Sequence, residues 1–473
     1  MIVHPIHVIL AILGVRMDFR KRREQLLTEP IGKVLITLAV PVMINNLIQT
    51  FYDLTDTYFV GRIGGNEVAA ISLVWPILFL MISFGVGMSM AGATLIAQYI
   101  GNGNEKQSRH IAGQIISFLM FIAIIIGIAG YYLTPSIVYW MGARNSLFTN
   151  ASTYLRIMFA GLPAMFMMFA FNAIKQGQGD NISPMIFGAI SVGINVVLDP
   201  IFIFALNQGI AGAARATVLA RVVVGTLSVM TLFSTRHQLT LQLRDLVPRM
   251  DQIIKICRLG IPSSFGQAMQ AFGFTILNVF LVGFGEVTLT AFAIGNRVNA
   301  LIIMPTMGIG NALSTVVGQN LGADNTARAK EAVKRSVIIS TITLVIGGMM
   351  IYPLSDRLIG VFTQNPEVIF HGGNYLRLIM LSAPLMGFFQ ILNGTFQGSG
   401  HTVYSMILMM GRLWGLRLPM IVALSHTPSF GPNSVWYAMI ASNFIICCIG
   451  WGIYFTGRWQ RKVIKDVRTA VEL

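Results

Sequence analysis

Two copies of one short pattern decide the fold of this chain: AQYIGNGN at residues 97–104 and GQNLGADN at residues 318–325. The copies stand 221 residues apart, and IKQGQGD at 174–180 returns as TFQGSGH at 395–401 with the same offset. Chance matching of apolar sequence rarely aligns so many polar and glycine positions without a gap. The chain is therefore predicted to contain two copies of one structural unit.

The composition is that of a polytopic membrane protein. Of 473 residues, 55% are apolar and 11% are charged, and the mean hydropathy is +0.70. A soluble fold carries about 25% charged residues, because its surface must be wetted. The net charge of +15 does not indicate nucleic acid, since the basic residues are dispersed among long apolar segments. We expect membrane lipids as partners and no nucleic acid.

The sequence contains twelve apolar segments long enough to span a bilayer. They are 33–60, 68–98, 109–133, 152–176, 182–207, 212–235, 252–282, 288–318, 329–353, 368–397, 402–424 and 434–457. The expected fold is an all-α integral membrane protein with twelve transmembrane helices in two six-helix lobes related by the internal repeat. The predicted parts are an N-terminal cytoplasmic segment at 1–30, an N-lobe at 31–236, a cytoplasmic connector at 237–251, a C-lobe at 252–457 and a cytoplasmic tail at 458–473.

The basic residues predict the orientation in the membrane. With these segments, 15 of the 33 Lys and Arg residues lie in loops or tails on the side of the N-terminus, and eight more lie near segment ends on that side, which makes 23. Three lie in loops on the other side: Arg62, Arg144 and Arg357. By the positive-inside rule, both termini should lie in the cytoplasm. The expected location is the bacterial cytoplasmic (inner) membrane, with a multi-pass topology.

The first sixteen residues leave the start of translation open. They are apolar but interrupted by Pro5, and they are too short to span a bilayer. The basic run of residues 20–23 follows them rather than preceding them, which does not fit a signal sequence. Translation from Met17 and a leader at residues 1–16 are the two alternatives.

Several kinds of site are disfavoured by missing residues. No G-x-x-x-x-G-K-[ST] motif occurs, so no P-loop ATP site is expected. Cys257, Cys447 and Cys448 form no CxxC pair, and the seven histidines fall at segment ends, loops or the N-terminal tail. No metal centre, cofactor or enzyme active site is therefore predicted. The remaining classes of membrane protein are a secondary carrier and a flippase. We expect the protein to be a monomer.

Acidic residues inside the segments are the sharpest functional signal, since each costs a few kcal/mol at the bilayer centre. Asp53 and Asp56 lie one helical turn apart in the first segment, and Asn195 and Asp199 share one face of the fifth. Two facing carboxylates in an apolar cavity cannot both stay ionised without a counter-charge, so the pair is predicted to bind H⁺ or Na⁺. The equivalent positions of the second half hold no acids. Alternatively, Asp53 faces water and Asp199 breaks its helix beside Pro200.

Basic residues inside the segments include Arg221, Arg297, Arg412 and Arg417. One interpretation makes Arg417 an anchor for an anionic substrate or a partner for a carboxylate. The interpretation we favour from sequence has these arginines bonded to helix-end carbonyls or snorkelling to the surface. We expect three residues at the substrate cavity: Asp53, Gln49 and Arg417.

Three motifs carry a resemblance to a known family: LTDTYFVGRIGG at residues 54–65 and the two repeated pairs quoted above. From about residue 27 to 461, the chain resembles the MATE family of multidrug and toxic compound extrusion transporters. The resemblance implies cation-coupled export of varied amphipathic, often cationic drugs by two lobes that alternate their opening. It also implies a cation-coupling site of Asp56, Asn195, Asp199 and Thr217, with Na⁺ at the first three if sodium is the ion.

The asparagine and aspartate of the fifth segment resemble the DinF-like branch of this family. The NorM-like branch instead places a glutamate in the seventh segment and an aspartate in the tenth. Here Gln270 stands near the first place, and the tenth segment contains no acid. The rival function is a lipid or lipid-linked oligosaccharide flippase of the same architecture. Such flippases tend to line the cavity with several cationic side chains, whereas the acids here favour a cation.

Overall fold

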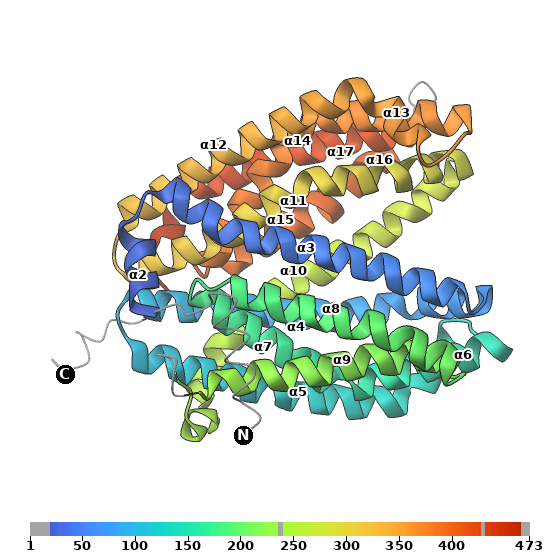
Figure 1. The fold of residues 1–473 in the computed structure, drawn as a ribbon. Coiled ribbons are helices and arrows are strands. Elements are labelled where there is room, and N and C mark those ends of the chain that lie inside the picture. Colours follow the sequence, from blue (N-terminus) through green and yellow to red (C-terminus); the bar gives the residue numbers. More distant parts are fainter. Residues whose placement is uncertain (1–18, 235–239, 427–430, 465–473) are drawn as a thin grey trace. The chain divides into compact units, whose positions relative to one another are not determined.

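The described part of the chain is built from helices alone (Figure 1). The computed structural model describes residues 19–234, 240–426 and 431–464, so the question of a start at Met17 concerns residues outside these ranges. The α-helices are α2 (Phe19–Thr28), α3 (Ile31–Gly61), α4 (Gly65–Gly101), α5 (Glu105–Trp140), α6 (Asn145–Ala160), α7 (Leu162–Gly177), α8 (Ile182–Pro200), α9 (Gly209–Leu232), α10 (Met250–Gly283), α11 (Glu286–Gly322), α12 (Thr326–Ile351), α13 (Ser355–Gly360), α14 (Pro366–Gly398), α15 (Thr402–Met410), α16 (Leu418–Ser425) and α17 (Asn433–Phe455). Two π-helices, η1 (Ile201–Ala205) and η4 (Gly411–Arg417), and three short 3₁₀ helices, η2 (Leu243–Leu246), η3 (Tyr352–Leu354) and η5 (Arg458–Gln460), complete these ranges.

The helices that could cross a membrane agree with the twelve predicted segments. Within the described residues, eleven are long and apolar enough, and the number is twelve when α6 and α7 are taken as one bent span. These two helices meet at a bend of 48°. Gly161 separates them and Pro163, in the first turn of α7, lacks the N–H that would continue the helical hydrogen bonds. The all-helical membrane fold is confirmed, with residues 152–176 divided at this bend.

The chain divides into two compact units. Unit 1 contains α2 and Ile44–Gly260, and unit 2 contains Glu29–Met43 and the chain from Ile261 onward. Helices α3 and α10 are therefore each shared between the units. The divisions fall close to Pro41 and Pro262, which lie inside these helices and are related by the sequence repeat. The lobe boundaries predicted from the sequence stay a prediction.

The packing inside each unit follows the repeat. In unit 1, α4 packs against α5, α6 and α7, and α9 packs against α6, α7 and α8. In unit 2, α11 packs against α12 and α14, and α14 packs against α17. Helices α4 and α11 correspond by the repeat, as do α7 and α14. The same pairs of helices thus form the interior of both units.

The quoted motifs are the tight turns that follow α4 and α11. Gly103 has φ of 77° and its repeat equivalent Asp324 has φ of 60°, so both turns use the left-handed region. Asn104 and Asn325 come next, and the side chain of each accepts a hydrogen bond from the backbone N–H three residues later, at 3.0 and 3.1 Å. They cap the N-termini of α5 and α12. This explains why polar and glycine positions recur there in the sequence.

The second repeated motif brings two pairs of helices into close contact. A Cβ atom on Gly177 of α7 would lie 2.8 Å from a backbone oxygen of α4, and one on Gly398 of α14 would lie 2.2 Å from a backbone oxygen of α11. Only glycine permits this approach. Two residues later, Gly179 and Gly400 both have φ of 80°. The close approach of α7 to α4 in unit 1 and of α14 to α11 in unit 2 therefore depends on glycine in both units.

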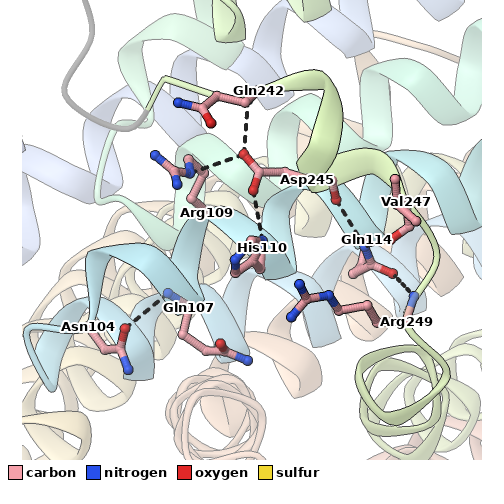
Figure 2. Close-up of polar contacts among 9 residues, drawn as sticks. All are labelled: Asn104, Gln107, Arg109, His110, Gln114, Gln242, Asp245, Val247 and Arg249. Atoms are coloured by element: carbon pink, nitrogen blue, oxygen red, sulfur yellow. Dashed lines mark hydrogen bonds and ion pairs between the residues drawn. The ribbon is translucent and has the colours of Figure 1, made fainter.

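The connector between the halves docks on α5 of unit 1 (Figure 2). The carboxylate of Asp245 in η2 lies 3.0 Å from Arg109 Nε and 2.7 Å from His110 Nδ1, and it accepts the backbone N–H of Gln242 at 2.9 Å. The Gln114 side chain donates to two connector carbonyls at 2.9 and 2.7 Å. Because the Asp245 side chain is fully buried, residues 242–249 are anchored to α5 instead of crossing freely to α10.

Candidate functional site

Helix α3 carries three of the predicted site residues, all within unit 1. Gln49 Nε2 donates a hydrogen bond to Asp53 Oδ1 at 2.9 Å, and both side chains are exposed. Asp56, three residues further along the helix, is half-buried. The exposed pair of Gln49 and Asp53 thus differs in environment from Asp56.

Helix α8 supplies the buried part of the site. Asn195 is 2% exposed and Asp199 is fully buried, and Asn195 Nδ2 donates to Asp199 Oδ1 at 3.1 Å. Their spacing of four residues places them on one face of the helix. The α-helix ends at Pro200, but the chain continues as the π-helix η1. Asp199 is therefore enclosed and does not stand at an exposed helix end.

Thr217 of α9 joins the three helices. Its hydroxyl accepts a hydrogen bond from Asn195 Nδ2 at 3.3 Å and lies 3.2 Å from the hydroxyl of Tyr52 on α3. Asn195 thus donates to both Asp199 and Thr217, which leaves its carbonyl oxygen available. Three of the four residues that the sequence predicted for cation coupling, Asn195, Asp199 and Thr217, are thus joined by hydrogen bonds in unit 1.

The electrostatics of this cluster favour a positively charged ligand. Asp56 and Asp199 interact electrostatically with each other, and Arg221 of α9 interacts with Asp53 and Asp56. Among the described residues, Asn195 Oδ1 and Asp199 Oδ2 are buried acceptors without a hydrogen-bond partner. Leaving such an acceptor unsatisfied costs about 1–3 kcal/mol of folding free energy. A bound proton, or a hard cation that prefers oxygen ligands, would offset this cost. In the same ranges, no three His, Cys, Asp or Glu side chains gather as they would around a metal ion.

The sequence interpretation missed three residues of this cluster. Tyr52 contacts Thr217, while Tyr154 of α6 interacts electrostatically with Asp56 and Asp199. Arg221, treated as an ordinary basic residue, stands among the acids. A signal for Tyr52 was its position one turn before Asp56, on the same face of the helix.

Arg417, the third residue expected at the substrate cavity, belongs to unit 2. It is 1% exposed, and its guanidinium donates to Ser442 Oγ at 3.1 Å and to Asn443 Oδ1 at 2.8 Å. Its guanidinium is therefore buried among side chains of α17 and does not snorkel to the surface. Gln49 and Asp53 belong to unit 1, so the expected cavity residues are distributed over both units.

A model of the MatE family matches the chain twice, at residues 41–201 and 262–422. This chain belongs to the MatE family. The two matches have the same length and begin 221 residues apart, which is the offset of the repeated motifs. The predicted resemblance to MATE transporters is confirmed, and so is the arrangement of the fold as two copies. MatE proteins are membrane transporters; the assignment to the DinF-like branch stays a prediction.

Relatives and solved structures of MatE proteins cover most of the chain. The probable multidrug resistance protein YoeA of Bacillus subtilis is 27% identical over 90% of this chain and 93% of its own length. The probable multidrug resistance protein NorM of Thermotoga maritima is 26% identical over 94% of this chain and 96% of its own length. A crystal structure of MATE in the bent conformation gives a TM-score of 0.87 at 26% identity, covering 93% of this chain and 98% of that chain.

Proposed function

We propose that this chain is a secondary active multidrug exporter that moves amphipathic or cationic molecules out of the cell in exchange for H⁺ or Na⁺ by alternating access. Its membership of the MatE family supports the proposal, as do relatives named multidrug resistance or multidrug export proteins. The observation that carries it is the cluster of buried, unpartnered acceptors at Asn195 and Asp199, with Asp56 beside them.

In the proposed mechanism, the coupling ion binds at Asp56 and Asp199. Asn195 and Thr217 provide neutral oxygen atoms, and no other cofactor takes part. Binding of the ion neutralises negative charge that would otherwise attract a cationic drug, so ion and drug compete for the protein. Helix α3 then repacks around Pro41, and the substrate leaves as the ion enters. In unit 1 we propose Asp53 with Gln49 as substrate contacts, and in unit 2 we propose Arg417.

The same proposal includes the placement of the protein. We expect the bacterial cytoplasmic membrane, both termini in the cytoplasm and a monomer surrounded by lipid. The asymmetry of basic residues supports this orientation. A DinF-like coupling site is supported by the hydrogen bonds that join Asn195, Asp199 and Thr217. The NorM-like branch instead places an aspartate in the tenth segment, whereas the acid of α14, Glu367, stands in the first turn of that helix.

The exchange is tested by measuring efflux activity as ethidium accumulation in everted membrane vesicles, whose lumen corresponds to the outside of the cell. A protonophore and a sodium ionophore collapse the proton and sodium gradients separately, and vesicles without the protein are the control. We expect efflux to stop when one of the two gradients is removed. Efflux that survives the loss of both gradients would refute the proposed exchange.

A lipid or lipid-linked oligosaccharide flippase is the second candidate function. The buried Arg412 and Arg417 favour it, since cationic side chains can meet a phosphate. Reconstitution with a fluorescent phospholipid, followed by chemical bleaching of the outer leaflet, separates the two functions. Protein-dependent bleaching of the inner-leaflet lipid without ethidium transport would favour the flippase.

A further inference from the structure

Unit 2 contains a buried cationic pair on an unusual helix. In the π-helix η4 the hydrogen bonds join residues five apart, which turns Arg412 and Arg417 toward one side more closely than an α-helix would, and the two charges interact electrostatically. In an α-helix, residues at this spacing would point roughly 140° apart. The two side chains are only 2% and 1% exposed. Single π-helical turns are frequent at functional sites.

Neither arginine has a carboxylate partner among the described residues. Arg417 donates to two neutral side chains of α17. Arg412 contacts Met386 Sδ at 3.1 Å and lies 4.1 Å from the centre of the Phe389 ring, while its Nε is buried without a partner. A buried charge without a counter-charge costs several kcal/mol. The pair therefore calls for an anion.

The acids of unit 2 that the structure describes do not supply that anion. Four of them form ion pairs elsewhere: Glu29 with Lys33, Asp324 with Lys462, Glu331 with Arg335, and Asp356 with Arg377. Two more, Glu286 and Glu367, stand in the first turns of α11 and α14. Among the described acids of unit 2, none forms an ion pair with Arg412 or Arg417.

Two neutral donors lie in the same region. Tyr375 of α14 and Trp436 of α17 are fully buried, and their ring centres are 4.7 Å apart. Within the described chain, the Tyr375 hydroxyl and the Trp436 indole nitrogen have no hydrogen-bond partner. Tyr375 also interacts electrostatically with Arg417. Buried donors are almost always paired in native proteins, so several unpaired donors in one region indicate a missing acceptor.

The repeat sharpens this contrast between the units. Tyr375 is the repeat equivalent of Tyr154, which interacts with the acids Asp56 and Asp199 in unit 1. The same position of the repeat therefore interacts with acids in unit 1 and with a buried arginine in unit 2. Among the described residues, the buried charges of unit 2 near this position are cationic, whereas the charges near it in unit 1 include two acids.

We propose that Arg412, Arg417, Tyr375 and Trp436 form a binding site for one oxyanion group, a sulfonate, carboxylate or phosphate, carried by an amphiphilic substrate. The planar guanidinium matches oxyanions with paired N–H donors. The neighbouring Phe389 and the aromatic pair supply apolar surface for the rest of the molecule. This inference deepens the proposed export function. It rests on that function, because only an exporter would carry the bound amphiphile across the membrane as its substrate.

The test uses two fluorescent amphiphiles with the purified full chain in lipid nanodiscs. The first, 8-anilinonaphthalene-1-sulfonate, carries the oxyanion, and N-phenyl-1-naphthylamine is the matched molecule without it. We expect Arg412→Gln and Arg417→Gln each to weaken binding of the sulfonate by about tenfold or more, because a charge-assisted bond is lost. Binding of the neutral amine should change much less. Empty nanodiscs give the background.

Further variants keep the result interpretable. Arg297→Gln removes a charge from an exposed position of unit 2 and should leave sulfonate binding unchanged. Tyr375→Phe keeps the ring and removes the donor, so it should weaken sulfonate binding several-fold even if an arginine variant does not fold. Sulfonate binding that is equal in the wild type and in folded Arg412, Arg417 and Tyr375 variants would overturn the site.

Competition identifies the source of the oxyanion. If inorganic phosphate displaces the sulfonate at equal concentration, the ligand is a free anion and the amphiphile proposal is wrong. Weak displacement by phosphate supports an amphiphile. Arginine-dependent binding together with no wild-type ethidium efflux would refute the export function while the anion site stands. Normal efflux with arginine-independent binding would refute the site alone.

Discussion

Replacement of Asp199 by asparagine removes one charge from the candidate coupling site and almost nothing from its shape. Asp199 Oδ1 accepts from Asn195 Nδ2 at 3.1 Å, and the asparagine oxygen can accept the same bond. Asp199 Oδ2 is buried without a partner in the described chain, so the substitution breaks no hydrogen bond there. We expect the protein to insert and to unfold at a temperature no lower than that of the wild type.

The effect should instead fall on the coupling ion. A hydrogen bond or ligand contact to a charged group contributes about 1.5–3 kcal/mol. Loss of one such contact should lower the affinity for the coupling ion roughly 10- to 150-fold. The assay is the initial rate of ethidium accumulation in everted vesicles at a series of Na⁺ concentrations and pH values in the lumen, which gives the half-saturating concentration of each ion.

Asp53→Asn is the matched control for this variant. This variant also removes one negative charge, but from an exposed side chain of α3 that accepts a hydrogen bond from Gln49. We expect its half-saturating ion concentration to change less than about threefold, because exposed charges interact weakly. Wild-type ion dependence in Asp199→Asn, or an equal shift in both variants, would refute coupling at this cluster.

Three further predictions follow from other parts of the chain. Gly113→Ala brings a methyl group to 2.2 Å from a connector backbone oxygen, so the free energy of unfolding should fall by about 2 kcal/mol in denaturant titrations; an unchanged value would show that the connector is not docked on α5. Burial would raise the pKa of Asp180, but the Lys175 ammonium and hydrogen bonds from Ser183 hold that pKa below its usual range. The ionised Asp180 therefore stabilises the fold above the unfolded pKa of about 3.9, and this stabilisation is lost as pH falls below that value. Asp180→Asn should lower the melting temperature by the same amount at every pH from 5 to 8. A difference between variant and wild type that disappears within that range would contradict this pairing. Reporter fusions after Trp459 and at residues 142–147, where the turn after α5 leads into α6, should report opposite sides of the membrane, with the first cytoplasmic; a C-terminal fusion on the outer side would reverse the topology.

The fold was predictable from sequence because its rules are local and repeated. Apolar segments of spanning length predict membrane helices, and the glycine and asparagine positions mark turns that the backbone requires in both copies. The bend between α6 and α7 was not predicted, since the repeat equivalent of Pro163, Pro384, lies inside the continuous helix α14. A proline permits a bend, and the surrounding packing decides whether the helix breaks there.

The candidate site was only partly predictable. Asp56 and Asp199 stood out because acids are rare inside membrane segments. Tyr52 and Arg221 did not, because a tyrosine or arginine in a span is common at interfaces and has an ordinary explanation. Burial of Arg417 depends on the π-helix η4 and on α17, and no sequence period predicts a π-helix.

The divergence of the two copies has a consequence for the energetics of the proposed exchange. One monovalent cation entering as a monovalent cationic drug leaves moves no net charge across the membrane. A substrate that carries an additional oxyanion is neutral, so its export against the same ion moves one charge inward, which contributes about 2.3 kcal/mol at 100 mV. Neutralisation of the acids in unit 1 leaves the arginines of unit 2 charged. If both proposals hold, the first copy sets the ion dependence and the second sets which charge the substrate carries, so each property can vary without loss of the shared fold.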